Sequence, residues 1–346
     1  MSVAPVVSDS VTSNPSSSSR GGAILCFGEA LIDFLARPSK VAGEPRHFVE
    51  YAGGAPANVA VAAARLGGNA RFVGMLGEDM FGDFLAEQFQ HYGVDTRHVV
   101  RTDRAKTALA FVSLDGHGER SFSFYRPPAA DLLFRDSDFS VDSFVDAGVF
   151  HVCSNSLTEE AIAAATLAGM RRARTAGALV SMDMNLRPSL WPSDVDPAPR
   201  LLAALLEADL IKLCQSELDF LARHLGGERN ALQRLWVGYA TCVLITDGAT
   251  PIRWHTRTRS GEVATFKIAP ADTTGAGDAF VGGLLHRLAA LKVDAANFTD
   301  FLERESDFVD ALRYAAAVGA LATTRHGAFA AMPSADEVER LMQEQA

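Results

Sequence analysis

The chain has 346 residues, of which 48% are hydrophobic and 21% charged, and its formal net charge is −10 at pH 7. This composition predicts a globular protein with ample core, built as one large α/β domain or two smaller ones. The acidic charge argues against nucleic acid and anionic membrane as primary partners, and no apolar run approaches the length of a membrane span. The four cysteines lack metal-ligand spacing, which is typical of free thiols in a reducing compartment, so we expect a cytoplasmic protein without a zinc site.

The first 22 residues are rich in Ser, Pro and Val and show no apolar periodicity. They lack the basic start and apolar stretch of a signal peptide, so we expect residues 1–22 to form a disordered tail and residues 23–346 to form the folded domain. Its first buried strand is the apolar run 24–27. Asp33 follows among apolar residues, in the place where open α/β sheets bind their ligands, although a lone carboxylate there is often only a turn residue.

Gly53 and Gly54 open a segment that ends at Asn58 and leads into an alanine-rich helix predicted at 59–66. Two glycines let the backbone approach a ligand closely, and the Asn58 amide can both donate and accept hydrogen bonds. The same residues also suit a glycine-rich loop with an asparagine cap. Taken alone, the segment favours neither interpretation over the other.

Between residues 80 and 127 the pattern changes from helix to paired strands. Residues 80–92 predict an amphipathic helix, whereas 107–114 and 120–125 predict an antiparallel hairpin around a polar turn. Together with 34–51, this hairpin is expected to form a small sheet, with lid segments at about 34–51 and 98–127. Such a lid would exclude water from a sugar site; the alternatives are a plain edge hairpin or a dimer contact.

From residue 149 onward strands and helices alternate, which predicts a parallel sheet with helices on both faces. The expected strands are 149–153, 179–183, 210–213 and 242–247. The expected helices are 158–176, 200–208, 217–224, 280–291, 307–323 and 335–345.

Asp183, Asn185 and Arg187 occupy alternate positions at the end of the strand predicted at 179–183. Alternate side chains on an extended backbone point the same way, so these three are expected to face one site. There Arg187 could brace a phosphate or a substrate oxygen. The alternative is an ion pair between Asp183 and Arg187 that only holds a loop.

The segment Asp272-Thr-Thr-Gly275-Ala276-Gly277-Asp278 lies between a predicted strand at 263–268 and the predicted helix at 280–291. Open backbone N–H groups and the positive end of a helix dipole attract an anion there. Asp278 in the same turn could accept a proton from a hydroxyl, which suits phosphoryl transfer to an alcohol. The alternative is that Asp278 only caps the helix and the glycines only shape a turn.

Two other phosphate-binding motifs are excluded at this segment. Phe280 stands where the third glycine of a dinucleotide fingerprint would be, and no Gly-x-x-x-x-Gly-Lys-Ser/Thr loop occurs in the chain.

Taken together, the Gly53-Gly54-x-x-x-Asn58 and Asp272-Thr-Thr-Gly-Ala-Gly-Asp278 motifs resemble the ribokinase-like PfkB family of sugar kinases. The resemblance extends from residue 24 to residue 341. Within the family, Asp183-x-Asn185-x-Arg187-x-x-Leu190-Trp191 and Tyr125-Arg126-x-Pro128-x-Ala130-Asp131 are most similar to fructokinases. 2-Keto-3-deoxygluconate kinases share a version of the first of these segments.

The resemblance implies a three-layer α/β/α domain with a β-sheet lid, which uses ATP and Mg²⁺. It implies Asp278 as the general base, the turn from Gly275 through Ala276 to Gly277 as the anion hole, and Arg187 as a further catalytic residue. The remaining positions that match family sites are Asp33, Gly53, Gly54, Asn58, Arg126 and Asn185 for the sugar; Lys212, Thr246, Gly248 and Gly277 for the nucleotide; Glu217 for Mg²⁺; and Asp272, Thr274, Ala322, Arg325 and Gly327 for a monovalent cation such as K⁺.

The chain departs from the family pattern around the nucleotide. Cys214 stands in place of the asparagine of the family's Asn-x-x-Glu motif, Pro251 in place of a second loop glycine, and Ala316 in place of an asparagine expected near adenine. These departures leave the catalytic turn intact.

The resemblance implies an ATP-dependent fructokinase that forms fructose 6-phosphate. The first alternative is a 2-keto-3-deoxygluconate kinase, because Arg126 and Arg187 could hold a substrate carboxylate. An acidic Asp131 facing the pocket would repel such a sugar acid, which favours fructose. The second alternative, which Cys214 faintly favours, is a catalytically silent sugar-binding or regulatory relative. Many relatives dimerise, sometimes through the lid, and the sequence leaves open whether this chain forms a homodimer.

Overall fold

The computed structural model describes residues 22–37, 45, 47–114 and 120–345. The expected tail, apart from Gly22, and the polar turn of the hairpin lie outside the described residues. None of the helices in this described part combines the length and the hydrophobicity that a membrane span requires.

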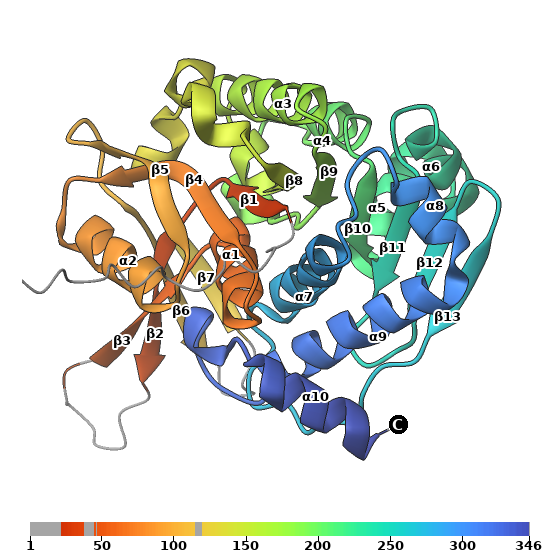
Figure 1. The fold of residues 1–346 in the computed structure, drawn as a ribbon. Coiled ribbons are helices and arrows are strands. Elements are labelled where there is room, and N and C mark those ends of the chain that lie inside the picture. Colours follow the sequence, from red (N-terminus) through yellow and green to blue (C-terminus); the bar gives the residue numbers. More distant parts are fainter. Residues whose placement is uncertain (1–21, 38–44, 46, 115–119, 346) are drawn as a thin grey trace, which may run out of the picture.

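A nine-stranded sheet forms the middle of the molecule (Figure 1), with the strand order β13-β12-β11-β10-β9-β8-β1-β4-β5. The strands from β5 to β11 are parallel, and β12 and β13 add an antiparallel edge. Continuous apolar runs form the central strands because helices cover both faces of the sheet. The strand bounds are β1 Ala23–Phe27, β4 Ala70–Gly77, β5 Asp95–Thr102, β8 Ala147–Cys153, β9 Leu179–Asp183, β10 Leu210–Cys214, β11 Cys242–Thr246, β12 Ile252–Thr256 and β13 Ser260–Val263.

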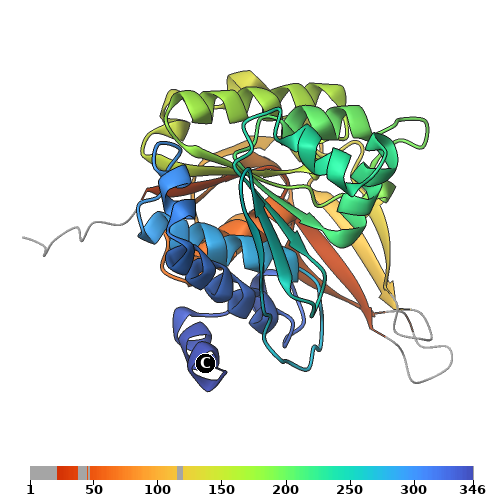
Figure 2. The ribbon, with the colours of Figure 1, turned by 90° about the vertical axis from the view of Figure 1, so that its right-hand side faces the viewer.

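The helices form two layers, one on each side of this sheet. Figure 2 shows the green helices α3 to α6 and the blue helices α7 to α10 on opposite sides. This arrangement confirms the expected three-layer α/β/α fold. The helix bounds are α1 Ala55–Arg65, α2 Met80–His91, α3 Glu160–Thr175, α4 Ala198–Leu205, α5 Gln215–Leu225, α6 Glu228–Leu235, α7 Ala276–Ala290, α8 Phe298–Glu303, α9 Glu305–Ala322 and α10 Ala335–Glu344, with short 3₁₀ turns at Ala130–Leu133, Asp136–Asp138, Val141–Phe144, Ser154–Leu157, Pro188–Leu190 and Phe329–Ala331.

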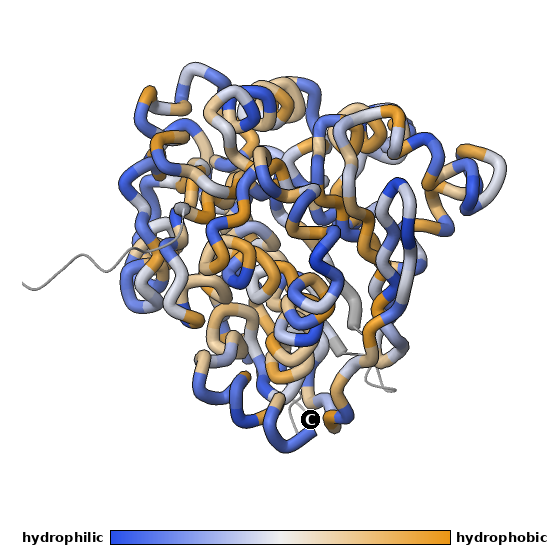
Figure 3. Tube along the Cα trace, turned by 45° about the vertical axis from the view of Figure 1, so that its right-hand side comes forward, coloured by the Kyte–Doolittle hydropathy of each residue, from blue (hydrophilic) through white to orange (hydrophobic). Residues whose placement is uncertain are grey.

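Strand β1 shows how the sequence divides its apolar residues between the two layers. Ile24 and Cys26 point to the cluster that contains α1, α7 and α9, whereas Leu25 and Phe27 point to the cluster that contains α3 to α6. The alternation follows from the two-residue period of a strand. Hydrophobic segments accordingly lie inside and hydrophilic loops outside (Figure 3).

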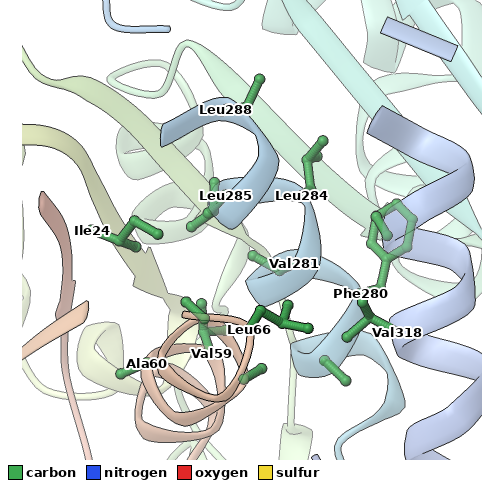
Figure 4. Packing of buried hydrophobic residues seen from close by; sticks show 14 of the residues in the cluster. Ile24, Val59, Ala60, Leu66, Phe280, Val281, Leu284, Leu285, Leu288 and Val318 are labelled. Atoms are coloured by element: carbon green, nitrogen blue, oxygen red, sulfur yellow. The ribbon is translucent and has the colours of Figure 1, made fainter. Parts of the chain in front are cut away.

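Helix α7 is held between α1 and α9 by its two adjacent glycines. A Cβ at Gly282 would lie 2.5 Å from the Cβ of Ala62 on α1, and one at Gly283 would lie 2.8 Å from Val318 on α9. Figure 4 shows Val281, Leu284 and Leu285 of α7 in the packed cluster, with Val59 on the α1 side and Val318 on the α9 side. This close packing fixes where the first turn of α7, with Asp278, lies.

A second, smaller sheet projects from the large one (Figure 1), with the order β3-β2-β6-β7. Its strands are β2 Leu31–Arg37, β3 His47–Gly53, β6 Ala108–Leu114 and β7 Arg120–Tyr125. β2 and β6 pair in parallel, while the two outer pairs are antiparallel. The expected hairpin and its pairing with the segment before residue 51 are therefore confirmed.

Part of the second lid segment was placed wrongly. Residues 98–102 belong to β5, which pairs in parallel with β4 in the large sheet. Chain order explains this placement, because β4, α2 and β5 form a β-α-β unit, whose second strand returns to the same sheet beside the first.

The strand expected at 263–268 is also wrong beyond its first residue. β13 ends at Val263, which pairs with Ile252, the first residue of β12. Pro251 precedes Ile252 and has no N–H group, so the partner strand ends there and cannot extend the pairing. The chain after Val263 therefore runs as a loop to α7, which begins at Ala276 rather than at 280.

Candidate active site

A cavity of about 830 Å³ lies where the carboxyl ends of β1, β9, β10 and β11 meet the small sheet. Ligands of open α/β sheets bind at this end of the strands. The cavity brings together many of the predicted residues and several that were not predicted. It is lined, among others, by Glu29, Asp33, Gly54, Asn58, Asn155, Asp183, Asn185, Arg187, Lys212, Cys214, Glu217, Thr246, Asp272, Thr274, Gly275, Gly277, Asp278 and His326.

Asp278 stands in the first turn of α7, after Gly275, whose φ of 74° is left-handed. The helix-cap alternative is wrong, because Gly275 occupies the cap position and Asp278 is the third helical residue. Asn58 Nδ2 donates to Asp278 Oδ2 at 2.7 Å, and Asn185 Nδ2 donates to Oδ1 at 3.2 Å. Two amides from distant parts of the chain therefore fix the carboxylate in the cavity wall.

Burial raises the pKa of Asp278 to about 7 from an ordinary 3.8. The hydrogen bond from Asn58 opposes this shift, the Asp183 carboxylate adds to it, and Arg187 and Lys212 partly offset it. A carboxylate with a pKa near neutrality is a much stronger base than an ordinary aspartate, while a large fraction stays ionised at pH 7. Its geometry and its pKa both suit proton abstraction from a bound hydroxyl.

Lys212 brings a buried positive charge to the same turn. Its Nζ lies 2.9 Å from Asp183 Oδ2, and a Cβ added at Gly277 would lie 2.9 Å from that Nζ. Burial favours the neutral amine, but the carboxylates of Asp183, Glu217 and Asp278 outweigh it and raise the Lys212 pKa. The ammonium group and the backbone of the turn thus lie together, as an anion site requires.

The segment after β9 reaches the cavity by a different route from the one predicted. Asn185 has a φ of 42°, so the backbone turns there instead of staying extended. Asp183 pairs with Lys212 on β10, so the alternative ion pair with Arg187 is wrong. Arg187 is exposed at the cavity rim.

Asp33 is carried into the cavity by β2 of the small sheet rather than by a loop. A Cβ at Gly53 would lie 2.3 Å from Asp33 Oδ2, so the glycine leaves room for this carboxylate without lining the cavity itself. Gly54, with a φ of 107°, lines the cavity and precedes α1. At both positions, steric constraints therefore favour glycine over a residue with a side chain.

Arg126 and Asp131 contradict their predicted roles. Arg126 is fully buried, its Nη2 lies 2.6 Å from Asp131 Oδ2, and it also donates to the Asn155 carbonyl at 2.7 Å. Neither Arg126 nor Asp131 lines the cavity. The two charges neutralise each other inside the protein, so Arg126 is not placed to bind a sugar and Asp131 is not placed to repel one.

Glu29 is a site residue that sequence reasoning missed. It lies just beyond the end of β1, separated from it by Gly28, and is buried, and its Oε1 accepts from Ala55 N at 3.0 Å and from Asn155 Nδ2 at 2.8 Å. Burial raises its pKa, and the positive charge of Arg126 opposes that shift. Its place at the end of the first strand was the available signal. Only the fold brings Asn155, from the 3₁₀ turn after β8, to it.

Glu217 lies in the first turn of α5 and lines the cavity. Its Oε1 accepts from Leu186 N at 2.7 Å and its Oε2 from Cys214 N at 2.8 Å. Each oxygen keeps a second lone pair, so the carboxylate fits a Mg²⁺ ion held mainly by nucleotide phosphates. Among the residues that the structure describes, no group of three or more His, Cys, Asp or Glu side chains forms a metal site of its own.

The residues predicted for a monovalent cation come together from two segments. The backbone N–H groups of Ala271 and Asp272 both donate to Thr323 O, at 2.8 and 2.9 Å, next to Ala322. Thr274 N donates to Asp272 Oδ1 at 2.8 Å. Gly327, with a φ of 94°, follows in the same segment, while the Arg325 side chain is directed to Glu337.

A second cavity, of about 360 Å³, shares Thr246, Pro270, Thr273 and Gly277 with the first. Gly248, in the loop after β11, lines it, and its far wall is formed by α9. Gly277 therefore stands at the junction of the two cavities. Two substrates bound one in each cavity would meet at the first turn of α7.

Comparison with known proteins agrees with this geometry. The model of the pfkB family of carbohydrate kinases matches residues 22–335. Fructokinase-1 of Zea mays is 41% identical over 321 residues, which cover 92% of this chain and 97% of that protein. The fructokinase of Xylella fastidiosa, whose crystal structure has bound ATP, is 58% identical with a TM-score of 0.90, over 93% of this chain and 98% of that one.

A fructokinase from Vibrio cholerae O395, solved with fructose, ADP and calcium ion, is 33% identical with a TM-score of 0.81, over 92% of this chain and 98% of that one. The resemblance seen in the two glycine motifs is thus confirmed over nearly the whole chain. The protein belongs to the pfkB family of carbohydrate kinases.

Proposed function

We propose that this protein transfers the γ-phosphoryl group of ATP to D-fructose and forms fructose 6-phosphate. The observation that supports this most strongly is the setting of Asp278, a buried carboxylate with a pKa of about 7, held by two amides beside an anion-binding turn. Relatives named as fructokinases match the chain along almost its full length.

In the proposed reaction the sugar occupies the larger cavity, with its 6-hydroxyl against Asp278. Asp278 takes the proton as the sugar oxygen attacks phosphorus, and the backbone N–H groups at the start of α7 stabilise the charge on the phosphoryl oxygens. Lys212 adds positive charge at the same turn, and Arg187 at the rim reaches toward the phosphates. A Mg²⁺ ion near Glu217 would neutralise phosphate charge.

The sugar would be held by groups from three parts of the fold. Asp33 comes from the small sheet, Gly54 and Asn58 from the start of α1, and Asn185 from the turn after β9. Because the small sheet carries Asp33, Leu31 and Phe124 on the cavity wall, its movement would close the site over the sugar and exclude water.

The alternative substrate, 2-keto-3-deoxygluconate, is less well served by this site. Two arginines were expected to bind its carboxylate. Arg126 forms a buried ion pair with Asp131, and of the two only Arg187 lines the cavity. An acid substrate would also lie beside Asp33, Glu29 and Asp278. The preference for fructose therefore rests on these carboxylates and not on Asp131.

The test is ATP turnover by the purified protein against fructose, other hexoses, ribose and 2-keto-3-deoxygluconate, with the product identified by NMR. We expect fructose to give the highest kcat/KM. A higher kcat/KM with the sugar acid would overturn the substrate assignment, and an absence of turnover with every sugar at saturating Mg²⁺ would favour the catalytically silent relative.

A further inference from the structure

The second cavity differs in chemistry from the first. The larger cavity is lined by at least six charged side chains, including Glu29, Asp33 and Lys212. The second is walled by the β11–β12 loop, the loop before α7, the start of α7 and one side of α9, and the residues that line it are Thr, Gly, Ala, Ile, Phe and Pro. Among its described lining residues, none has a charged or amide side chain.

The threonines of this cavity are already engaged or lie at its entrance. Thr265 Oγ1 donates to Ala249 O at 2.6 Å, and Thr323 Oγ1 donates to Ala320 O at 2.7 Å. Thr246 and Thr273 line both cavities, so they lie at the junction, on the phosphate side. Away from the junction, the described side chains provide a ligand with a shaped, apolar surface. Their hydroxyl oxygens can act only as hydrogen-bond acceptors.

Because Gly277 lines both cavities, a nucleotide with its phosphates at this junction would place its base in the second cavity. We propose that the base is held by fit and apolar contact and is not read by side-chain hydrogen bonds, so the enzyme uses purine nucleoside triphosphates as a class, GTP and ITP as well as ATP. This inference rests on the proposed kinase function and extends it to the phosphoryl donor.

The expected discrimination follows from how pockets reject wrong ligands. A site that hydrogen-bonds a polar group rejects an analogue lacking that group by roughly 10⁴–10⁵-fold, whereas an apolar pocket discriminates between similar shapes by only about 10²-fold. Adenine and guanine differ in their polar edge and little in shape.

The chemical step is the same with either donor. The bond between the γ-phosphorus and the β,γ-bridging oxygen breaks as the sugar oxygen bonds to phosphorus, the hydroxyl proton passes to Asp278, and the nucleoside diphosphate leaves with the bridging oxygen. Only the binding of the base differs, so the difference should appear mainly in KM for the nucleotide.

The first measurement is kcat/KM for ATP, GTP and ITP at saturating fructose and Mg²⁺, together with Kd for ADP and GDP by calorimetry. We expect GTP and ITP to reach within about 100-fold of ATP. Normal ATP turnover with GTP more than about 10⁴-fold poorer would overturn the proposal and would show that backbone groups read the base. If no nucleotide supports turnover, the kinase assignment fails instead, and the ratio of the two Kd values still tests the inference.

The second measurement introduces a hydrogen-bonding group into the cavity wall. Ala320 on α9 is only partly buried and lines the cavity, so the nearly equal-sized substitutions Ala320→Leu, Ala320→Asn and Ala320→Asp can be compared. The Leu variant should change kcat/KM for ATP and GTP by the same factor. The Asp variant should shift the GTP-to-ATP ratio toward GTP by at least tenfold relative to Leu, because guanine presents two adjacent N–H donors to a carboxylate.

Melting temperatures of the three variants provide the folding control. Equal GTP-to-ATP ratios in folded Leu, Asn and Asp variants would place the base away from this wall and overturn the proposal.

Discussion

At the scale of single residues, the site depends on one carboxylate placed where a carboxylate is costly. Asp278 is buried, and two amides from sequence positions 220 and 93 residues away hold its oxygens. The charged form is disfavoured enough to bring its pKa to about 7. A residue in such a setting is expected to contribute to function and to lower stability.

Replacing this carboxylate should separate turnover from binding. Asp278→Asn keeps the size of the side chain but cannot accept a proton, so we expect kcat to fall by about 10²–10⁴-fold while fructose still binds. Steady-state turnover assays measure kcat, and calorimetry measures fructose binding. A variant that keeps more than about a tenth of wild-type kcat would show that Asp278 is not the general base.

The same substitution should reveal the stability cost of the charge. The pKa of Asp278 is raised on folding, so its contribution to stability is full below the unfolded value of about 3.8 and is lost as pH rises toward 7. Each pKa unit corresponds to about 1.4 kcal/mol. Between pH 4 and pH 8, the free energy of unfolding of Asp278→Asn should therefore rise by a few kcal/mol relative to that of the wild type. Urea unfolding at several pH values tests this. A difference that is flat across the range would contradict the raised pKa.

At the scale of secondary-structure elements, buried charges link segments that are distant in the chain. Arg126, just after β7, joins the 3₁₀ turn that contains Asp131 to the Asn155 carbonyl in the 3₁₀ turn after β8. Glu217 joins the start of α5 to the segment after β9 through two backbone N–H groups. These contacts position the cavity walls, and they explain why conspicuous charged residues do not all line the cavity.

The buried arginine should therefore matter for stability and little for the sugar. Arg126→Leu leaves the Asp131 carboxylate buried without its partner, which costs about 3–5 kcal/mol. The matched double variant Arg126→Leu/Asp131→Leu should recover much of that loss. Chemical denaturation and fructose kcat/KM at low temperature distinguish the roles: a stable Arg126→Leu protein with a KM for fructose raised by 100-fold or more would return Arg126 to the sugar site.

Two residues at the start of α5, Glu217 and Cys214, are expected to respond differently to substitution. Gln cannot accept at its nitrogen, so Glu217→Gln should lose one of two backbone hydrogen bonds, destabilise by about 1–3 kcal/mol, and raise the Mg²⁺ concentration needed for half-maximal activity. Cys214→Asn should change kcat at saturating Mg²⁺ by less than about tenfold, because the thiol is engaged by Ser216 Oγ and by the Glu217 N–H, and water can replace one group around the metal. A large activation by Cys214→Asn would instead indicate a chain that had lost its catalytic competence.

At the scale of the whole molecule, the large sheet supplies a rigid base and the small sheet one wall of the cavity. Two hydrophobic clusters, one on each face of the large sheet, hold the layers together, and α7 is locked between α1 and α9. Among the described residues, the small sheet contributes Ile32 and Ala52 to one of these clusters, and a minor third cluster forms around Leu31, Ala108, Ala110 and, after β7, Ala129. This difference in packing supports the proposed closing movement of the small sheet.

The N-terminal segment should have little effect on the whole domain. Its composition, without apolar periodicity, predicts that a chain lacking residues 1–21 keeps its melting temperature and its kcat within about twofold, since surface changes away from packed features usually alter stability by less than about 0.5 kcal/mol. Differential scanning calorimetry on both chains is the measurement. A drop of several degrees would mean that the segment docks on the domain.

The sequence by itself determined most of the buried strands and long helices and identified the turn proposed to be catalytic. Apolar runs of five residues separated by amphipathic stretches are sufficient to predict buried parallel strands and their helices, because this periodicity is local. The motif around Asp278 is local as well and predicted phosphoryl transfer to an alcohol, and the resemblance of this motif and of the paired glycines before Asn58 to known motifs indicated the family.

Only the tertiary structure decided how the charges pair and which of them face the cavity. Arg126 looked like a sugar ligand and is paired with Asp131; Asp183 looked like a partner for Arg187 and pairs with Lys212. Glu29 carried almost no local signal and lies in the cavity wall. The physical reason is that a charge takes the partner that strand order and burial bring within about 3 Å, and that partner can come from any part of the chain.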